Sequence, residues 1–106
     1  IRRRLDVIDI KSLQEEIMNN KVSKGFNTTD IPLEFMLLTG EVSEAFDAWR
    51  KKKSDLGEEI ADVMIYLLGL SKMLDINLED ELVAKIEKNR ERKYVRKNGT
   101  LVKEEN

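Results

Sequence analysis

The segment from about Leu56 to Leu74 constrains the fold most, because apolar side chains cover most of its circumference if it is helical. These side chains are Ile60, Ala61, Val63, Met64, Ile65, Leu67, Leu68 and Leu70. A helix with one face in water carries more polar positions than this segment does. We therefore expect a central helix, covered by other helices of the chain and shared with a second subunit.

Three further segments have the apolar period of a helix. They span about 9–21, 30–50 and 77–92. In the first, Ile10, Leu13 and Ile17 recur at the spacing of one helical face, and a polar loop follows at 23–29. In the second, Asp30-Ile31-Pro32 marks the start, because proline is tolerated in the first turn. The sequence therefore predicts four helices joined by short connections.

Two short motifs mark the ends of these helices. Ser54 or Asp55 can cap the third helix, and Asp55 and Glu58 have the spacing of a capping box. Asn98-Gly99 between β-prone residues predicts a hairpin over about 94–102, because both turn positions need positive φ. A lone hairpin is marginally stable, so it should pack on the helices or pair with another chain. We predict one all-α domain over 1–106, a four-helix bundle with a short C-terminal β-hairpin.

The composition excludes several kinds of chemistry. The 106 residues include no cysteine and no histidine, which rules out disulfides, thiolate nucleophiles, cysteine-bound zinc and serine–histidine catalysis. With 19 basic and 21 acidic residues, the total charge favours neither nucleic acid nor an anionic membrane as a partner. The basic start Arg2-Arg3-Arg4 precedes Leu5-Asp6 and not an apolar run, so it is not typical of a secretory signal. We expect a cytoplasmic protein without a membrane segment.

Two predicted helices each carry a pair of acidic residues three positions apart. The pairs are Glu41 with Glu44 and Glu59 with Asp62. Residues at this spacing share one helical face, and the short connection favours antiparallel packing of the two helices. Four carboxylates can then converge on one site. Such an oxygen-only site suits a hard cation, Mg²⁺ or Mn²⁺.

The simpler interpretation is that these acids are ordinary solvated side chains, since 21 acidic residues produce such spacings by chance. Their positions argue against it. Glu41 lies in line with Leu37 and Ala45 and so interrupts an apolar stripe, and no basic residue occurs between Asp55 and Ser71. Uncompensated carboxylates on core-facing helices repel one another and resist desolvation unless a cation is present. The pattern therefore favours a metal site.

The two acidic pairs, separated by fourteen residues, resemble the E-x-x-E…E-x-x-D motif of the MazG-like nucleoside triphosphate pyrophosphohydrolases, which belong to the all-α NTP pyrophosphatase superfamily. The flanking segments Gly40–Ala45, Glu58–Leu68 and Lys85–Arg92 are similar to that family as well. The resemblance extends over about 13–92. Gly40 is a departure, because many relatives carry a second acid at this position.

The resemblance implies hydrolysis of nucleoside or deoxynucleoside triphosphates to the monophosphate and pyrophosphate, as a house-cleaning activity. It assigns Glu41, Glu44, Glu59 and Asp62 as ligands of Mg²⁺, with Mn²⁺ as the alternative ion. Carboxylate-held metal supplies the positioning and charge neutralisation that phosphoryl chemistry needs. We assign Glu44 the further role of orienting or deprotonating the attacking water. Relatives of this kind are commonly homodimers or homotetramers.

The remaining substrate contacts are also implied by the resemblance. Lys85, Asn89 and Arg92 share one face of the fourth helix and are candidates for holding phosphates or a metal-bound water, and Lys88 lies beside that face. Lys24, Gly25 and Phe26, in the loop after the first helix, are candidates for the base pocket. Phe26 offers a ring that either stacks on a base or packs in the core.

Two other functions fit parts of the sequence. A non-enzymatic helical interaction or regulatory module would need the acids only for structure. The stretch 85–97, with seven basic and two acidic residues, is a candidate surface for single-stranded nucleic acid. That function calls for aromatic residues that stack on bases, and Tyr94 is the only one nearby, so no nucleic-acid partner is expected.

Overall fold

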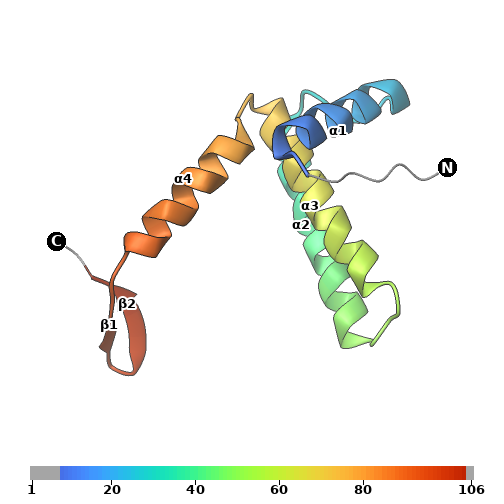
Figure 1. The fold of residues 1–106 in the computed structure, drawn as a ribbon. Helices are drawn as coiled ribbons and strands as arrows, with labels where there is room; N and C mark the ends of the chain where they lie inside the picture. The colour runs from blue at the N-terminus through green and yellow to red at the C-terminus, as the bar shows by residue number, and fades with distance from the viewer. Residues whose placement is uncertain (1–7, 105–106) are drawn as a thin grey trace.

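The computed structural model describes residues 8–104 and consists of four helices followed by a β-hairpin (Figure 1). The elements are α1 (Ile10–Lys24), α2 (Ile31–Arg50), α3 (Leu56–Met73), α4 (Leu78–Glu91), β1 (Tyr94–Lys97) and β2 (Thr100–Lys103). The predicted fold class is confirmed, and each helix lies within a few residues of its predicted bounds. The basic start at 2–4 and its interpretation lie outside the described residues.

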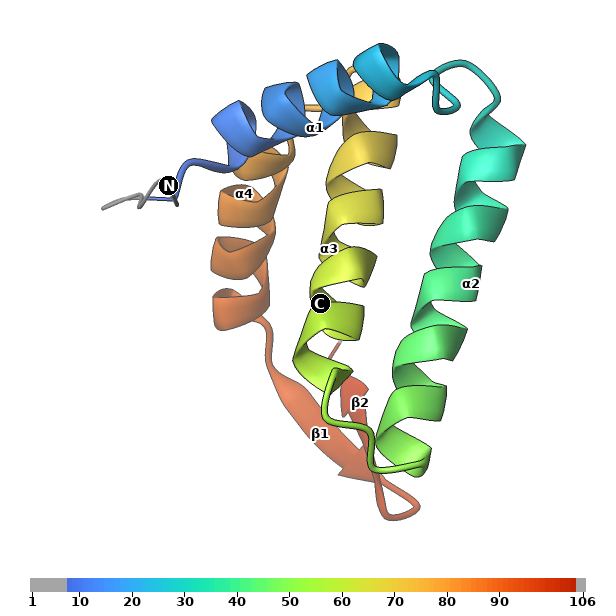
Figure 2. The same cartoon turned by 90° about the vertical axis from the view of Figure 1, so that its right-hand side faces the viewer.

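α2 and α3 form an antiparallel pair that lies side by side along most of its length (Figures 1 and 2). α2 begins as predicted, because the Asp30 carboxylate accepts a hydrogen bond from the Leu33 N–H at 3.1 Å and Pro32 occupies the first turn. A short connection with Lys52 at φ 55° reverses the chain. This reversal places both acidic pairs on neighbouring helices.

The predicted capping box at the start of α3 is wrong. Asp55 precedes the helix, but its side chain makes no capping hydrogen bond, and Glu58 is exposed. The reason is the backbone at Asp55, where ψ is 15°. The side chains of Asp9, Asp30 and Asn77 do cap their helices, and their ψ values of 112°, 96° and 93° are in the extended range that a capping residue needs.

α1 crosses the end of α3 and is fixed there by a buried glutamine. The Gln14 side-chain amide donates to the Ser71 hydroxyl at 2.7 Å and to the Ile76 carbonyl at 2.9 Å. Its carbonyl accepts from the Leu78 N–H at 3.3 Å. Because Gln14 is only 2% exposed, these bonds are shielded from water. They connect α1 and α3 to the start of α4.

α4 diverges from the α2–α3 pair, as Figure 1 shows, and it contacts α1 and α3 but not α2. It contains no buried residue. The radius of gyration is 17.3 Å, whereas a compact chain of this length has about 13 Å. All four predicted helices are present, but they do not close into a compact bundle within one chain.

The hairpin pairs Tyr94 with Lys103 and Lys97 with Thr100, and Asn98 and Gly99 both have positive φ, as predicted. It packs on none of the four helices, so that part of the prediction is wrong. Its pairing with another chain stays a prediction. The two strands lie at the far end of α4 (Figure 1).

Many apolar side chains of α2 and α3 remain exposed in the single chain. These side chains are Phe35, Met36, Val42, Phe46 and Trp49 on α2, and Ile60, Met64, Ile65 and Leu67 on α3. The rings of Phe46 and Trp49 stack at a centroid distance of 6.0 Å, and Trp49 is 63% exposed. α3 is central, as predicted, but other helices of the same chain cover only part of it. Within residues 8–104, no helix is both long and apolar enough to span a bilayer.

Candidate active site

α2 and α3 bring three of the predicted carboxylates to one point. Glu41, Glu44 and Glu59 each offer an oxygen, and these oxygens lie within 4.8 Å of one another. Asp62 lies outside this set, yet its negative charge contributes to the raised pKa values of both Glu41 and Glu59. The four predicted acids therefore occupy one region of the α2–α3 pair.

The surroundings of Glu41 and Glu59 raise the pKa of both side chains. Burial, then the neighbouring Glu44 carboxyl, and then the charges of Asp62 and Glu59 together raise the pKa of Glu41 to about 6. Burial also raises the pKa of Glu59, followed by the charges of Asp55 and Glu44. Lys53 opposes the shift at Glu59 only weakly. The site thus concentrates negative charge that a bound cation would relieve.

Three buried carboxylate oxygens of this region have no hydrogen-bond partner among the described residues. They are Glu41 Oε2, Asp55 Oδ1 and Glu59 Oε2. Buried polar atoms in folded proteins are nearly always paired, so such atoms call for a ligand. Hard divalent cations prefer carboxylate oxygens, and the converging set of Glu41, Glu44 and Glu59 therefore fits Mg²⁺ or Mn²⁺. The unpartnered Asp55 oxygen was not anticipated from the sequence, which assigned that side chain to a cap.

A cavity of about 620 Å³ lies beside the carboxylates, between α1, α2 and α3. Its lining includes Leu37, one helical turn before Glu41, and Tyr66, one turn after Asp62. Burial raises the pKa of Tyr66, and the charges of Glu41, Glu34 and other acids raise it further. Tyr66 therefore lines the cavity and also experiences the negative charge of the acidic site.

The residues predicted for the base pocket, Lys24, Gly25 and Phe26, are placed differently. Gly25 ends α1 with φ 73°, a left-handed conformation that suits glycine, and the chain then turns so that Phe26 lines the cavity. Phe26 is 56% exposed, so it does not pack in the core. Lys24 is exposed at the end of α1 and does not line the cavity.

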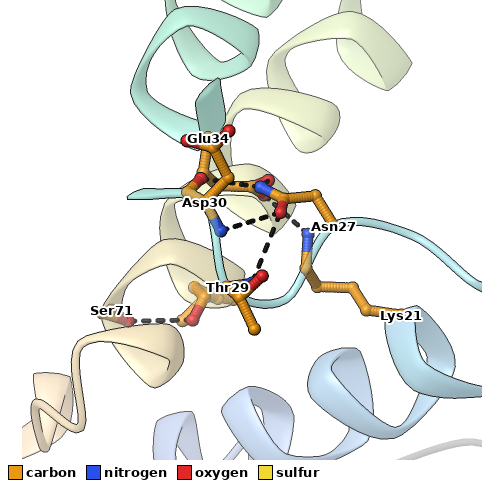
Figure 3. Close-up of polar contacts among 7 residues, drawn as sticks. Lys21, Asn27, Thr29, Asp30, Glu34 and Ser71 are labelled. Atoms are coloured by element: carbon orange, nitrogen blue, oxygen red, sulfur yellow. Dashed lines mark hydrogen bonds and ion pairs between the residues drawn. The ribbon is translucent and has the colours of Figure 1, made fainter. Parts of the chain in front are cut away.

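A buried polar cluster also lines the cavity (Figure 3). The Lys21 ammonium donates to Glu34 Oε2 at 2.7 Å, and the Asn27 amide donates to Glu34 Oε1 at 3.1 Å. The Asn27 carbonyl oxygen accepts from the backbone N–H groups of Thr29 and Asp30. Sequence reasoning missed this cluster, because a lysine in a last turn and a glutamate in a first turn are what the helix dipole favours on any surface.

The predicted phosphate contacts on α4 are not brought to the carboxylates of the same chain, since α4 does not contact α2. Lys85, Lys88 and Asn89 are exposed, and Arg92 is half-buried. The positive charge of Arg92, then desolvation and the charge of Lys88, lower the pKa of Lys85. The three cations thus lie close together, and within residues 8–104 none of them forms an ion pair with an acid.

A pair of antiparallel helices that holds clustered carboxylates beside a cavity defines an all-α protein with a site for a divalent metal. The MazG-like family model matches residues 33–105 of this sequence. The chain belongs to the MazG-like family, which confirms the resemblance to MazG-like nucleoside triphosphate pyrophosphohydrolases drawn from its motifs.

Among solved structures, the chain is similar to the MazG-like pyrophosphohydrolase of cyanophage S-2L, with a TM-score of 0.72 and 23% sequence identity. The match covers 93% of this chain and 100% of that one. The cyanophage protein was solved bound to dGDP and three catalytic Mn²⁺ ions per active site. At this identity the similarity establishes a common fold. No significant match was found among curated proteins.

Proposed function

We propose that this chain hydrolyses nucleoside or deoxynucleoside triphosphates to the monophosphate and pyrophosphate with Mg²⁺ or Mn²⁺. The observation that carries the proposal is the cluster of Glu41, Glu44 and Glu59 beside the cavity of about 620 Å³. Family membership supports it, and so does the nucleotide and metal content of the cyanophage relative. Asp62 completes the proposed ligand set from the next turn of α3.

The side chains have separable roles in this reaction. A bound divalent cation supplies charge neutralisation at the phosphates and lowers the pKa of water. Glu41 and Glu59, which are half-buried, hold ions with the oxygens that lack other partners. Glu44 is exposed, so its carboxylate can reach solvent water and accept its proton during attack on the phosphate.

The position of the cavity defines an orientation for the bound nucleotide. With the phosphates at the carboxylates, the sugar lies along Tyr66 and the base enters the cavity, where Phe26 offers a ring to stack against. A cavity of this volume is in the range that holds a drug-sized ligand. Lys24, exposed beside Phe26, is proposed to contact the substrate from the surface.

A second copy of the chain is proposed to complete the site. The exposed apolar side chains of α2 and α3 need cover, and α4 has no buried residue of its own. An assembled homodimer or homotetramer would place Lys85, Lys88, Asn89 and Arg92 of one chain near the phosphates bound by another. Residues 1–106 are proposed to form a single domain. Its proposed role is nucleotide house-cleaning, and its proposed location is the cytoplasm.

Pyrophosphate release tests the proposal directly. Ordinary and damaged nucleotides are screened with Mg²⁺, with Mn²⁺ and with a chelator. We expect turnover only with metal, and a loss of at least about 100-fold in Glu41→Gln, because a ligand charge is removed. Glu58→Gln is the matched control, since Glu58 is exposed on the same helix as Glu59. Turnover in the chelator, or full activity of Glu41→Gln, contradicts the metal site.

Metal binding to the wild-type protein distinguishes an enzyme from a non-enzymatic interaction module. A metal that binds only the folded state raises the melting temperature. An isotherm for Mg²⁺ with a higher melting temperature supports the enzyme, whereas no response to Mg²⁺ or Mn²⁺ favours the module.

A further inference from the structure

We propose that Lys21, held in place by Glu34, determines which nucleotides bind in the cavity. The selected nucleotides have a base with a carbonyl oxygen at the position that faces the Lys21 ammonium. The bases in question are 6-oxopurines and 4-oxopyrimidines, as opposed to their 6-amino and 4-amino counterparts. The inference rests on the proposed function in one respect, that the base of the substrate occupies this cavity. It goes further by naming the residue that distinguishes one base from another.

Lys21 and Glu34 are the two charged residues that are buried within residues 8–104. Lys21 is 8% exposed and Glu34 is 1% exposed. A buried ion pair adds little net stability, because desolvation of both charges offsets their attraction, and apolar residues of similar volume often serve equally well. Besides Lys21, α1 and α3 line this cavity with the apolar Leu13, Ile17 and Ile65 and with the polar Glu16, Asn20 and Tyr66. A fixed charge at this place therefore fits ligand recognition better than core stability.

The hydrogen-bond inventory shows what the cluster still offers to a ligand. The Asn27 amide gives its two N–H donors to the Asp30 carbonyl and to Glu34, and its oxygen accepts two backbone N–H groups. Asn27 is thus fully used. Glu34 accepts with both oxygens, one from Lys21 and one from Asn27. An ammonium has three N–H donors, and within the described residues Lys21 uses one of them.

The position of the Lys21 ammonium is also fixed. Its stem packs against α3 at Gly69, where an added Cβ would lie 3.4 Å from Lys21 Cδ. Glu34 holds the other end of the side chain, and Asn27 in turn holds Glu34 (Figure 3). A donor that is restrained at both ends discriminates between ligands, because it cannot turn away from an unsuitable group.

The chemistry of the bases follows from this donor. Guanine presents O6 and N7 as neighbouring acceptors, a pair that lysine commonly recognises, and uracil and thymine present O4. Adenine and cytosine present an amino group at the equivalent positions. An amino group that faces Lys21 leaves donors opposed and unpaired, which costs affinity. We expect a preference of about 10- to 100-fold for the oxo base.

The experiment compares nucleotides that differ at this one group. kcat/KM is measured for dGTP against the 2,6-diaminopurine deoxynucleotide, and for dUTP against dCTP. We expect the oxo member of each pair to be preferred by about 10-fold or more. Equal efficiency within both pairs overturns the proposal, and this comparison needs only the wild-type protein.

A variant then tests whether Lys21 is responsible. Lys21→Met combined with Glu34→Gln removes both charges together and keeps an acceptor for Asn27, so no buried charge is left unpaired. We expect the preference to fall to about threefold or less. Lys11→Met, an exposed lysine at the other end of α1, is the control. A preference that survives in the double variant overturns the role of Lys21.

Binding of the monophosphates without metal separates this inference from the proposed function. Calorimetry compares dGMP with the 2,6-diaminopurine monophosphate. If no triphosphate is hydrolysed but dGMP still binds preferentially through Lys21, the proposed function fails and the selectivity stands. If triphosphates are hydrolysed without preference, the function stands and the selectivity is wrong. If the protein neither binds nor hydrolyses nucleotides, both are wrong.

Discussion

The α2–α3 pair and the arm formed by α4 and the hairpin differ in packing and in charge. The pair holds clustered acids, among which Glu41 and Glu59 have raised pKa values, and its helices contact each other along their length. The arm holds clustered cations, has no buried residue in α4, and diverges from the pair (Figure 1). The two charge clusters are complementary, but within one chain they do not meet.

This difference separates two steps of the proposed reaction. The acidic cluster is assembled within one chain, so metal binding should need only the α2–α3 pair. Lys85, Lys88 and Arg92 form no ion pair within residues 8–104, so phosphate binding should need a second chain. Variants of the arm and of the pair are therefore expected to affect different measurements.

The largest expected effect comes from removing the cations of the arm. Lys85→Ala with Arg92→Ala should lower kcat/KM by about 100-fold or more, because charge on the transferring phosphates loses its stabilisation. The rise in melting temperature with Mg²⁺ should be unchanged, since the acids are intact. Lys97→Ala, on the hairpin, is the control. A loss of the Mg²⁺ response in the double variant would contradict the separation of the two steps.

Co-expression sharpens this prediction. A chain that lacks the α4 cations and a chain with Glu59→Gln are each expected to be inactive. If one chain supplies acids and another supplies cations, mixed dimers contain one complete site, and about a quarter of the wild-type activity should return. No recovery would mean that each site uses its own α4.

The next largest effect is expected at the exposed apolar surface of the pair. Trp49→Glu with Ile60→Glu should weaken self-association by at least about 30-fold, because charges replace apolar side chains at a surface that we expect to be covered. Light scattering measures the change in mass. Val22→Glu is the control, an equally exposed apolar position on α1. A wild-type protein that is monomeric at all concentrations would contradict the assembly.

The helix and hairpin bounds could be predicted from the sequence because they depend on local chemistry. Asp30 and Pro32 define the start of α2, and Asn98-Gly99 defines the turn of the hairpin, through hydrogen bonds and φ values of the residues themselves. The acidic spacing was equally local, so the convergence of three carboxylates could be anticipated once two antiparallel helices were assumed.

What could not be predicted depends on contacts between distant segments. The capping box failed because a four-residue pattern does not specify ψ at Asp55. The Lys21–Glu34 pair was missed because each residue alone is ordinary for its place in a helix. Apolar periodicity identified the faces of α3 and α4 that need cover, but it does not say which chain covers them.

A smaller effect is expected from pH, through the raised pKa of Glu41. Between the ordinary value of 4.5 and about 6, the folded metal-free protein binds a proton more tightly than the unfolded chain does. Its stability should therefore fall as the pH rises through this range. Mg²⁺ needs the ionised carboxylate, so the melting-temperature increase caused by Mg²⁺ should grow over the same range. Melting curves with and without MgCl₂ from about pH 4.5 to 7.5 measure both trends.

Glu41→Gln provides the control for this pH dependence. The glutamine does not titrate, so the metal-free variant should show a flatter stability profile below about pH 6. A Mg²⁺ effect that is the same at every pH in the wild-type protein would contradict competition between proton and metal at this side chain.

The smallest effect is expected at Asp55, whose carboxylate does not cap α3 and whose buried oxygen has no hydrogen-bond partner within residues 8–104. It lies four residues before Glu59 and raises the pKa of that side chain, so the two charges repel within the acidic site. Asp55→Asn should stabilise the metal-free protein slightly, because it removes one member of a like-charge pair. Urea denaturation without metal measures it. Asp30→Ala, which removes a working cap from α2, should instead cost about 1 kcal/mol. A comparable loss in Asp55→Asn would show that Asp55 stabilises the start of α3 after all.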